Sequence, residues 1–552
     1  MNLNDLQGLK IEDNLNIVGL VLASFIVIVS SYKWYIHRRC KLPPGPWGVP
    51  FLGYFPFLSK HPFKDLRKLA EKYGNIFSVN LGGAYTVVLN DFESVKEAVN
   101  NPAILDRPPH VFDFVPNGLG FASNNGAEWI EQRRFALKTL KDIGSGRIAW
   151  ESSVESEVED FVQLLEQQCG KPYDVHDPLS TSVSNNITGI ILGKPLLRGD
   201  PRRAIVNGGV EGAIMSFSSS NLAFYFPFLM QFLAKLGLSS HADTFKKISD
   251  FHEFFKSEME RCKKIPPAEW NEKIFIDGYL KEIQKVKGKG TKTWFNESNL
   301  IGSAEAFIIG GSDTSRTFLC WIFLAMAAYP EVQKNVQKEI DAILGKDGKL
   351  PWSERAKLPY TYAALLETNR WRSITPLSLP RCASENTRIF GYDIPKGSSI
   401  LLNIYSLHND PKYWEDPDSF RPERFLDKNG CLIMTRLDSY APFSLGRRIC
   451  PGETVAMMEL FHYFTAVMQR FDIRALENSP PNVDDGVDGI TYQPVPQKLR
   501  EEEALKDAAT SKNGYQTLYF PLQQSQNSQI EINIKHTSKR SAMLDALDDS
   551  SW

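Results

Sequence analysis

The stretch FSLGRRICPG, residues Phe443–Gly452, surrounds a single cysteine with glycine, arginine and proline. Gly446 can adopt a positive φ and turn the chain tightly, and Pro451 suits the first position of a following helix. The positive end of that helix's dipole would favour negative charge on the Cys450 sulfur. The stretch therefore predicts a loop that presents a thiolate to a metal.

The stretch also fits the pattern F-x-x-G-x-R-x-C-x-G, which is too long and too mixed in chemistry to be expected by chance. On these residues the chain resembles the cytochrome P450 family, the haem-thiolate monooxygenases, over about residues 43–499. The resemblance implies that Cys450 is the axial ligand to the iron of haem b, iron protoporphyrin IX. Such a ligand pushes electron density toward the iron and favours O–O cleavage. It also implies that Phe443 packs on the thiolate side of the haem and that Gly452 closes the cofactor-binding motif.

Composition excludes several classes of protein. The 552 residues are 42% hydrophobic, enough for a large buried core, and the net charge of −2 leaves no basic surface of the kind that nucleic-acid binding needs. We therefore expect no nucleic-acid partner. The seven cysteines are scattered without C-x-x-C spacing, which indicates a reducing compartment rather than a zinc or disulfide framework.

An apolar run at residues 15–36 has the length of one membrane-spanning helix. Acidic residues precede it and basic residues follow it, namely Glu12 and Asp13 before, and Lys33, Arg38, Arg39 and Lys41 after. This asymmetry places the remainder of the chain in the cytosol. A cleaved signal peptide is the alternative, but it would carry a basic region first and a small-residue cleavage site afterwards. We predict a single-pass anchor in the endoplasmic reticulum membrane, with the catalytic domain facing the cytosol.

The chain divides into four segments. Residues 1–36 form a luminal N-terminus and the anchor, residues 37–53 a Pro/Gly-rich hinge, residues 54–499 the catalytic domain, and residues 500–552 a polar tail. The tail's composition predicts disorder, with a helix near residues 501–509.

Periodicity within the domain predicts a mainly α structure with small β-sheets, which the resemblance identifies as the cytochrome P450 fold. Helix-period segments lie at residues 152–168, 245–264, 300–328, 331–344, 360–371 and 453–469. Strand-like runs lie at residues 76–81, 86–88 and 398–404.

A helical segment reading FIIGGSDTSRT contains two consecutive glycines, which cost helix stability and so suggest a reason for being there. In the family the matching helix crosses the haem, and glycines here leave room for dioxygen. The resemblance implies that Thr314 and its acidic neighbour Asp313 relay protons to dioxygen. Without the resemblance, Gly310 and Gly311 would serve only close helix packing.

Glu367 and Arg370 stand three apart on a predicted helix, so they share one face and can pair. The spacing matches the E-x-x-R motif of the family, which joins an arginine of the segment here reading FRPERF. That arginine is Arg421 or Arg424, and motif order favours Arg424. The three residues hold the core around the haem and do not react.

Haem propionates are carboxylates, for which bidentate arginines and an indole N–H are natural partners. Four residues match positions that serve this purpose in the family: Trp129, Arg133, Arg381 and Arg448. Each alone could be a core aromatic or a solvated cation. As a set they predict the propionate site.

Electrons must come from another protein, because no G-x-G-x-x-G fingerprint opens a strand–helix unit. The resemblance to membrane-anchored members implies NADPH–cytochrome P450 reductase, with cytochrome b5 as a second donor. Basic residues that could dock an acidic donor are Arg134, Lys138, Lys141 and Arg447. A solvated face is the alternative interpretation of these charges.

Motif order places the substrate contacts in residues 112–121, 215–228 and 374–379 and at Ala306, Gly310 and Ile490. They are mostly apolar, as a pocket for a lipophilic molecule should be. We expect a monooxygenase that acts on a steroid, a fatty-acid-like molecule or a xenobiotic. Family members that rearrange hydroperoxides tend to lose the threonine that is present here as Thr314. A non-catalytic haem- or sterol-binding protein is the third alternative.

Overall fold

The computed structural model describes residues 24, 40–109, 115, 118–143, 148–167, 175–216, 241–287, 292–345, 348–433, 435, 437–475, 481–495, 515–520 and 530–535. Among these residues no helix is long and apolar enough to span a bilayer. Apart from Ser24, the anchor predicted at residues 15–36 lies outside the described residues, as does the predicted helix at residues 501–509.

Helices dominate the described chain. They are α2 (Pro62–Tyr73), α3 (Phe92–Asn100), α4 (Gly126–Ile143), α5 (Ile148–Glu166), α6 (His176–Leu192), α7 (Arg202–Ser216), α10 (His241–Lys263), α11 (Phe275–Val286), α12 (Glu297–Ala328), α13 (Pro330–Leu344), α14 (Pro359–Arg372), α15 (Ile404–His408) and α16 (Glu453–Arg470). The six predicted from periodicity, α5, α10, α12, α13, α14 and α16, have bounds within a few residues of the predicted ones. Proline begins α2, α13 and α14, where its fixed φ suits the first turn and its missing N–H costs nothing.

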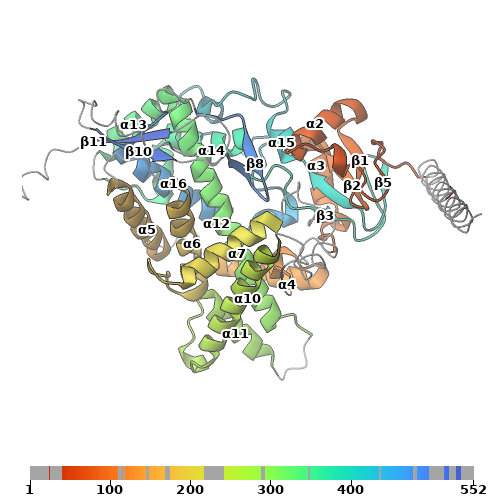
Figure 1. Ribbon diagram of the computed structural model, residues 1–552, viewed down its shortest axis with the longest axis horizontal. Coiled ribbons are helices and arrows are strands. Elements are labelled where there is room, and N and C mark those ends of the chain that lie inside the picture. The colour runs from red at the N-terminus through yellow and green to blue at the C-terminus, as the bar shows by residue number, and fades with distance from the viewer. Residues whose placement is uncertain are drawn as a thin grey trace, which may run out of the picture.

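Helix α12 runs through the middle of the molecule, between the helices on one side and the strand-rich part on the other (Figure 1). Asn296 caps its start by accepting a hydrogen bond from the Asn299 N–H. Almost every residue that follows is buried, as expected for a helix that is apolar all round and surrounded by others. Gly310 is exposed, and Gly311 and Thr314 are half-buried, so the surface of the helix is accessible at this point.

The strands of the described residues form small sheets. They are β1 (Ile76–Leu81), β2 (Ala84–Leu89), β3 (Arg381–Cys382), β4 (Thr387–Ile389), β5 (Tyr392–Ile394), β6 (Ser399–Leu402), β7 (Phe471–Ala475), β8 (Gly486–Asp488), β9 (Tyr492–Pro494), β10 (Tyr515–Phe520) and β11 (Ile530–Lys535). The largest has the order β1-β2-β6-β3, in which β2 and β6 are parallel and the other pairs antiparallel. It lies beside α2 and α3 at one end of the molecule (Figure 1) and carries Arg381 on β3.

Two short segments of the tail are described, and both are strands. Strands β10 and β11 pair with each other, and β11 pairs antiparallel with β7 of the domain. The sequences YQTLYF and IEINIK suit strands, because both are rich in aromatic or β-branched residues and IEINIK alternates isoleucine with polar residues. The mainly helical architecture with small sheets is otherwise as the sequence predicts.

Candidate functional site

The loop that carries Cys450 is held by its own backbone. Gly446 adopts φ +72°, and a Cβ there would come within 2.6 Å of the Val99 carbonyl oxygen, so only glycine fits. Cys450 donates its N–H to the Phe443 carbonyl oxygen at 2.9 Å, which closes the loop. A short 3₁₀ turn, η7 (Gly446–Arg448), lies between them.

The helix after the loop starts later than expected. Helix α16 begins at Glu453 with Gly452 as its N-cap, so the prediction that Pro451 takes the first helical position is wrong. The reason lies in the backbone of Gly452, whose N–H donates to the Cys450 sulfur instead of entering the helix. Glycine is an acceptable N-cap because it adopts the non-helical backbone at little cost.

The surroundings of Cys450 act on the pKa of its thiol in both directions. The residue is exposed, yet enough protein rings the sulfur that loss of water raises the pKa of the Cys450 thiol. The hydrogen bond from Gly452 opposes this rise, the Glu453 carboxylate adds to it, and the Arg133 guanidinium opposes it. A coordinating cation would favour the deprotonated sulfur further.

The four predicted propionate-binding residues come together beside this loop. Trp129 and Arg133 lie one turn apart on α4, and the guanidinium carbons of Arg448 and Arg133 lie 4.1 and 5.9 Å from the centre of the Trp129 ring. Arg381 reaches the loop from β3 and donates to the Leu445 carbonyl oxygen at 2.8 Å. All four side chains are at most 9% exposed.

These buried cations lack compensating charge. Burial, together with the charge of Arg133, lowers the pKa of Arg381 to about 10 and of Arg448 to about 9. Among the described residues, no acidic side chain forms an ion pair with Arg133, Arg381 or Arg448. Such a cluster is unfavourable unless an anion joins it.

Unsatisfied donors show what the cluster would accept. Trp129 Nε1, Arg381 Nη1 and Arg448 Nη1 are buried and have no hydrogen-bond partner among the described residues. Buried donors without partners are rare in native proteins and usually mark a missing ligand. Three N–H donors in a cationic cluster beside a cysteine fit the two carboxylates of a haem, so the residues present are suited to that cofactor.

Helix α12 carries the predicted proton-delivery residues. Thr314 donates its hydroxyl to the Gly310 carbonyl oxygen at 2.7 Å, one turn earlier. A Cβ on Gly310 would meet no atom within 4 Å, whereas one on Gly311 would lie 2.8 Å from the side chain of Ile187 on α6. The two glycines therefore differ, because only Gly310 opens onto free space while Gly311 allows α6 to approach.

Asp313 faces away from this opening. Its carboxylate is 1% exposed and is held by Arg316, by the Thr491 hydroxyl at 2.6 Å and by Gln493 at 3.1 Å. Asp313 thus fixes α12 to the segment around β9, and its oxygens are engaged by these partners.

The E-x-x-R pair, Glu367 and Arg370, is buried in the core. Arg370 donates through Nε and Nη2 to the two oxygens of Glu367, both at 2.7 Å, and its remaining donors go to the carbonyl oxygens of His408, Pro417 and Ser419. All five N–H groups of the guanidinium are therefore satisfied. Of the two candidate arginines, Arg424 places its side chain on Glu367 at 3.3 Å.

The other candidate, Arg421, contributes only its backbone N–H to Glu367, at 2.9 Å. Its side chain pairs with Glu415 at the surface.

His408 connects this pair to the cysteine loop. Its Nε2 accepts the Ala441 N–H at 3.0 Å and its Nδ1 lies 2.8 Å from the Ser373 hydroxyl. Because Nε2 accepts, we assign the proton to Nδ1, which makes the ring a neutral bridge. His408 therefore links the segment before the loop to Ser373, the C-cap of α14. The Tyr440 hydroxyl adds a hydrogen bond to the Leu366 carbonyl oxygen of that helix at 3.2 Å.

Two residues at the site lie outside the sequence motifs. Arg107 donates to the carbonyl oxygens of Leu379 and Pro380 at 2.9 and 2.8 Å, directly before Arg381. Burial and the charge of Arg448 lower the pKa of Arg107. No local pattern around Asp106–Arg107 could have revealed this role.

Glu459 is the second such residue, on the buried face of α16. One oxygen accepts from Asn186 Nδ2 at 2.6 Å, and Oε2 is buried without a partner among the described residues. Burial raises the pKa of Glu459 to about 7. A carboxylate in an otherwise apolar helix pattern was the available signal.

Some of the remaining predicted positions lie within the described residues, and others lie outside them. Arg134, Lys138, Lys141 and Arg447 are exposed, next to the exposed apolar residues Ile130 and Leu137 of α4. Of the substrate contacts, Phe121 packs against Phe307 in a tilted arrangement with ring centres 4.8 Å apart, and Ala306 and Ile374 are buried. Residues 110–114, 116–117 and 217–228 lie outside the described residues.

Comparison with known proteins agrees with this geometry. A family model described as Cytochrome P450 matches residues 43–500, and the chain is 34% identical to cytochrome P450 2J2 of Homo sapiens over 491 residues, 87% of this chain and 95% of that protein. The chain belongs to the cytochrome P450 family. It is also 33% identical to cytochrome P450 2D15 of Canis lupus familiaris over 516 residues, which cover 89% of this chain and 99% of that protein.

A match from an insect is similarly extensive. Cytochrome P450 18a1 of Drosophila melanogaster is 31% identical over 490 residues, 86% of this chain and 90% of that protein. The chain is thus a P450 monooxygenase whose cofactor is haem b. Members of this family take electrons from a redox partner and bind lipophilic substrates.

Proposed function

We propose that this P450 inserts one atom of dioxygen into a C–H or C=C bond of a steroid, a fatty-acid-like molecule or a xenobiotic, with the second atom leaving as water. The three unpartnered donors beside Cys450 are the observation that carries the proposal. Haem, when bound, supplies the activation of dioxygen. The protein supplies orientation, exclusion of water and protons.

In this proposal Cys450 is the axial ligand, and Trp129, Arg133, Arg381 and Arg448 hold the propionates. Gly452 donates its backbone N–H to the sulfur. Half-buried Phe443 limits the access of water to the thiolate and so tunes the potential. Phe443→Ala should leave haem binding intact and shift the reduction potential in a spectroelectrochemical titration. An unchanged potential would contradict this role.

Proton delivery is assigned to α12. The Thr314 hydroxyl holds a proton at the opening beside Gly310, and Asp313 is the acidic member of the pair. Because the Asp313 carboxylate is engaged by Arg316 and Thr491, it must exchange one of these partners before it can pass on a proton. Glu367, Arg370 and Arg424 hold the core and take no part in the reaction.

Electrons are proposed to come from NADPH–cytochrome P450 reductase, with cytochrome b5 as a second donor. The exposed face of α4 that combines Arg134, Lys138 and Lys141 with Ile130 and Leu137 suits an acidic partner with an apolar centre. Reversing the charge of Lys138 and Lys141 should slow reduction, most strongly at low salt. Lys334→Glu on α13, equally exposed but on another helix, is the control.

The location is proposed to be the endoplasmic reticulum membrane, with residues 15–36 as a single span and the catalytic domain in the cytosol. The run of apolar residues and the flanking charges support this. In microsomes, external protease should digest the domain, and alkaline carbonate should leave the chain in the pellet. Protection from protease would reverse the topology.

The deciding experiment is the carbon monoxide difference spectrum of the reduced protein, beside Cys450→Ser. A strongly red-shifted Soret band that the variant loses would support the thiolate ligand. Its absence in well-folded, haem-supplemented protein would favour a non-catalytic binding protein. Spin-shift titrations with steroids, fatty acids and xenobiotics would then identify the substrate class.

A further inference from the structure

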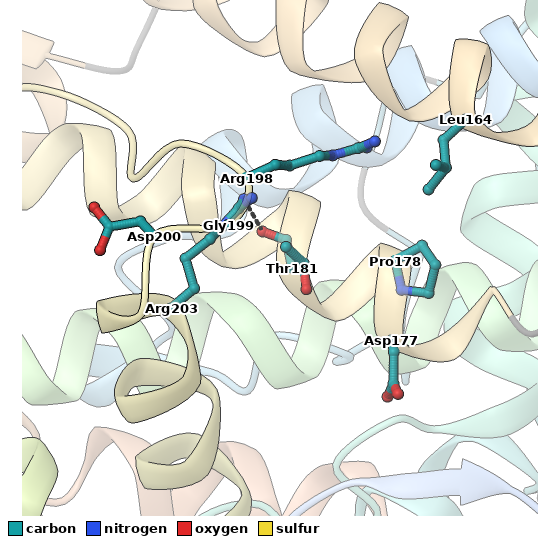
Figure 2. A pocket seen from close by; sticks show the side chains of 8 residues that line it. All are labelled: Leu164, Asp177, Pro178, Thr181, Arg198, Gly199, Asp200 and Arg203. Atoms are coloured by element: carbon teal, nitrogen blue, oxygen red, sulfur yellow. Dashed lines mark hydrogen bonds between the residues drawn. The ribbon is translucent and has the colours of Figure 1, made fainter.

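A pocket of about 590 Å³ lies between α5, α6 and the loop that enters α7 (Figure 2). It is lined by Leu164, Asp177, Pro178, Thr181, Arg198, Gly199, Asp200 and Arg203. None of these residues belongs to the haem-binding or proton-delivery sets. Its volume is in the range of pockets that bind small molecules.

One side of the pocket is apolar and another is cationic. Leu164 and Pro178 form the apolar side, and the Arg198 side chain extends toward Leu164 (Figure 2). Arg198 is exposed, so its guanidinium can reorient toward a ligand. The pairing of an arginine with apolar surface suits an amphiphile rather than an inorganic ion.

Neither arginine of the pocket is neutralised by an acid. Among the described residues, Arg198 donates to the Asp160 carbonyl oxygen at 3.4 Å, and Arg203 donates to the Thr181 carbonyl oxygen at 3.1 Å. Arg203 is 8% exposed, and its Nη1 has no partner among the described residues. Burial lowers the pKa of Arg203 even though the Glu157 carboxylate opposes this, so the guanidinium is incompletely compensated.

The two acids of the pocket are engaged elsewhere. Asp200 binds Arg202 with Oδ2 at 2.6 Å from Nη2, and its Oδ1 accepts the Arg202 backbone N–H at 2.9 Å. Asp177 pairs with His176 at 3.2 Å. Both carboxylates point away from the space between Arg198, Leu164 and Thr181 (Figure 2). Arg198 is therefore the charged side chain that extends across this space (Figure 2).

We propose that this pocket is an accessory binding site for an amphiphilic carboxylate, whose carboxylate pairs with Arg198 while its apolar chain lies on Leu164 and Pro178. Arg203, which donates to the Thr181 carbonyl oxygen, adds a second guanidinium to the lining. The site is independent of the oxidation chemistry, because the pocket shares no residue with that site.

Photolabelling of the full-length, haem-loaded protein tests this proposal. The probe is decanoic acid carrying a diazirine near its methyl end, and 1-phenylimidazole saturates the haem so that the active site is closed to the probe. Peptide mapping should find adducts on the segments that contain Leu164 and Pro178. Arg198→Gln, an exposed substitution, should lower this labelling about 10-fold or more, because a charge-assisted pair is lost.

Two controls make the outcome decisive. Decan-1-ol with the same diazirine should label these segments at least about 10-fold less than the acid, because it cannot pair with a guanidinium. Lys194→Gln, which removes an exposed charge from the same loop outside the pocket, should leave labelling unchanged. Absence of adducts on the two segments, equal labelling by the alcohol, or equal losses in both variants would overturn the proposal.

Discussion

Replacing Glu459 by glutamine should stabilise the protein increasingly as the pH rises. Burial raises the pKa of this carboxyl from its usual 4.5 to about 7. Each pKa unit corresponds to about 1.4 kcal/mol, so ionisation of Glu459 in the folded protein is disfavoured by about 3 kcal/mol. Asn186 satisfies one oxygen, and the other is buried without a partner among the described residues, which is why the charge is poorly tolerated.

The direction of this pH dependence follows from the difference in proton binding between the folded and the unfolded protein. Between the unfolded and folded pKa values the folded protein binds the proton more tightly, so the free energy of unfolding decreases as the pH rises through this range. Below pH 4.5 both states carry the proton and the penalty vanishes. Glu459→Gln cannot ionise. The stability of the variant relative to the parent should therefore grow by about 2 to 3 kcal/mol between pH 5 and pH 8.

Urea unfolding of the haem-loaded protein, followed by circular dichroism at pH 5, 6, 7 and 8, measures this difference. A new unsatisfied amide N–H would shift the curve of the variant by a constant amount without changing its slope. Glu159→Gln is the control, because Arg470 lowers the pKa of Glu159 although burial opposes it, and its titration lies below this pH range. Parallel curves for Glu459→Gln and the parent would refute the reasoning.

Further predictions concern the core and the site. Glu367→Gln should lower the free energy of unfolding in urea by about 3 to 5 kcal/mol, because it leaves the buried Arg370 without its charged partner. Gly310→Ala should stabilise the apoprotein by up to about 1 kcal/mol, since it meets open space and favours helix, whereas Gly311→Ala should destabilise it by about 1 to 3 kcal/mol because it meets α6. Thr314→Ala should raise the hydrogen peroxide formed per NADPH consumed, and unchanged coupling would contradict the proton-delivery role. Arg448→Gln should speed haem transfer to apomyoglobin about 10- to 100-fold, and an unchanged rate would remove it from the propionate set.

The spacing of residues was sufficient to predict those features whose residues are close together in the sequence. The cysteine loop and the E-x-x-R pair could both be identified from the sequence, since each is defined within one turn or one helix face. Spacing did not separate Arg421 from Arg424, because one supplies a backbone N–H and the other a side chain to the same carboxylate. That distinction depends on how the chain folds back over α14.

Contacts between distant parts of the chain were not predictable. Arg107 acts on carbonyl groups 272 and 273 positions away, and Glu459 pairs with Asn186, also 273 positions away. Arg107 has no local pattern that distinguishes it from an ordinary surface charge, and the apolar pattern around Glu459 indicates burial but not its partner. The pairing of β11 in the tail with β7 in the domain is a contact of the same long-range kind.

The buried arginines beside the Trp129 ring connect the lifetime of this protein to cofactor supply. With Arg133, Arg381 and Arg448 uncompensated by acids among the described residues, the polypeptide's own charges do not balance at the centre of the fold. A ligand that binds only the folded state and supplies the missing negative charge shifts the folding equilibrium by mass action. When haem is scarce, a larger share of newly made chains should open and reach the proteases, so the abundance of the protein would follow haem availability without any dedicated sensor.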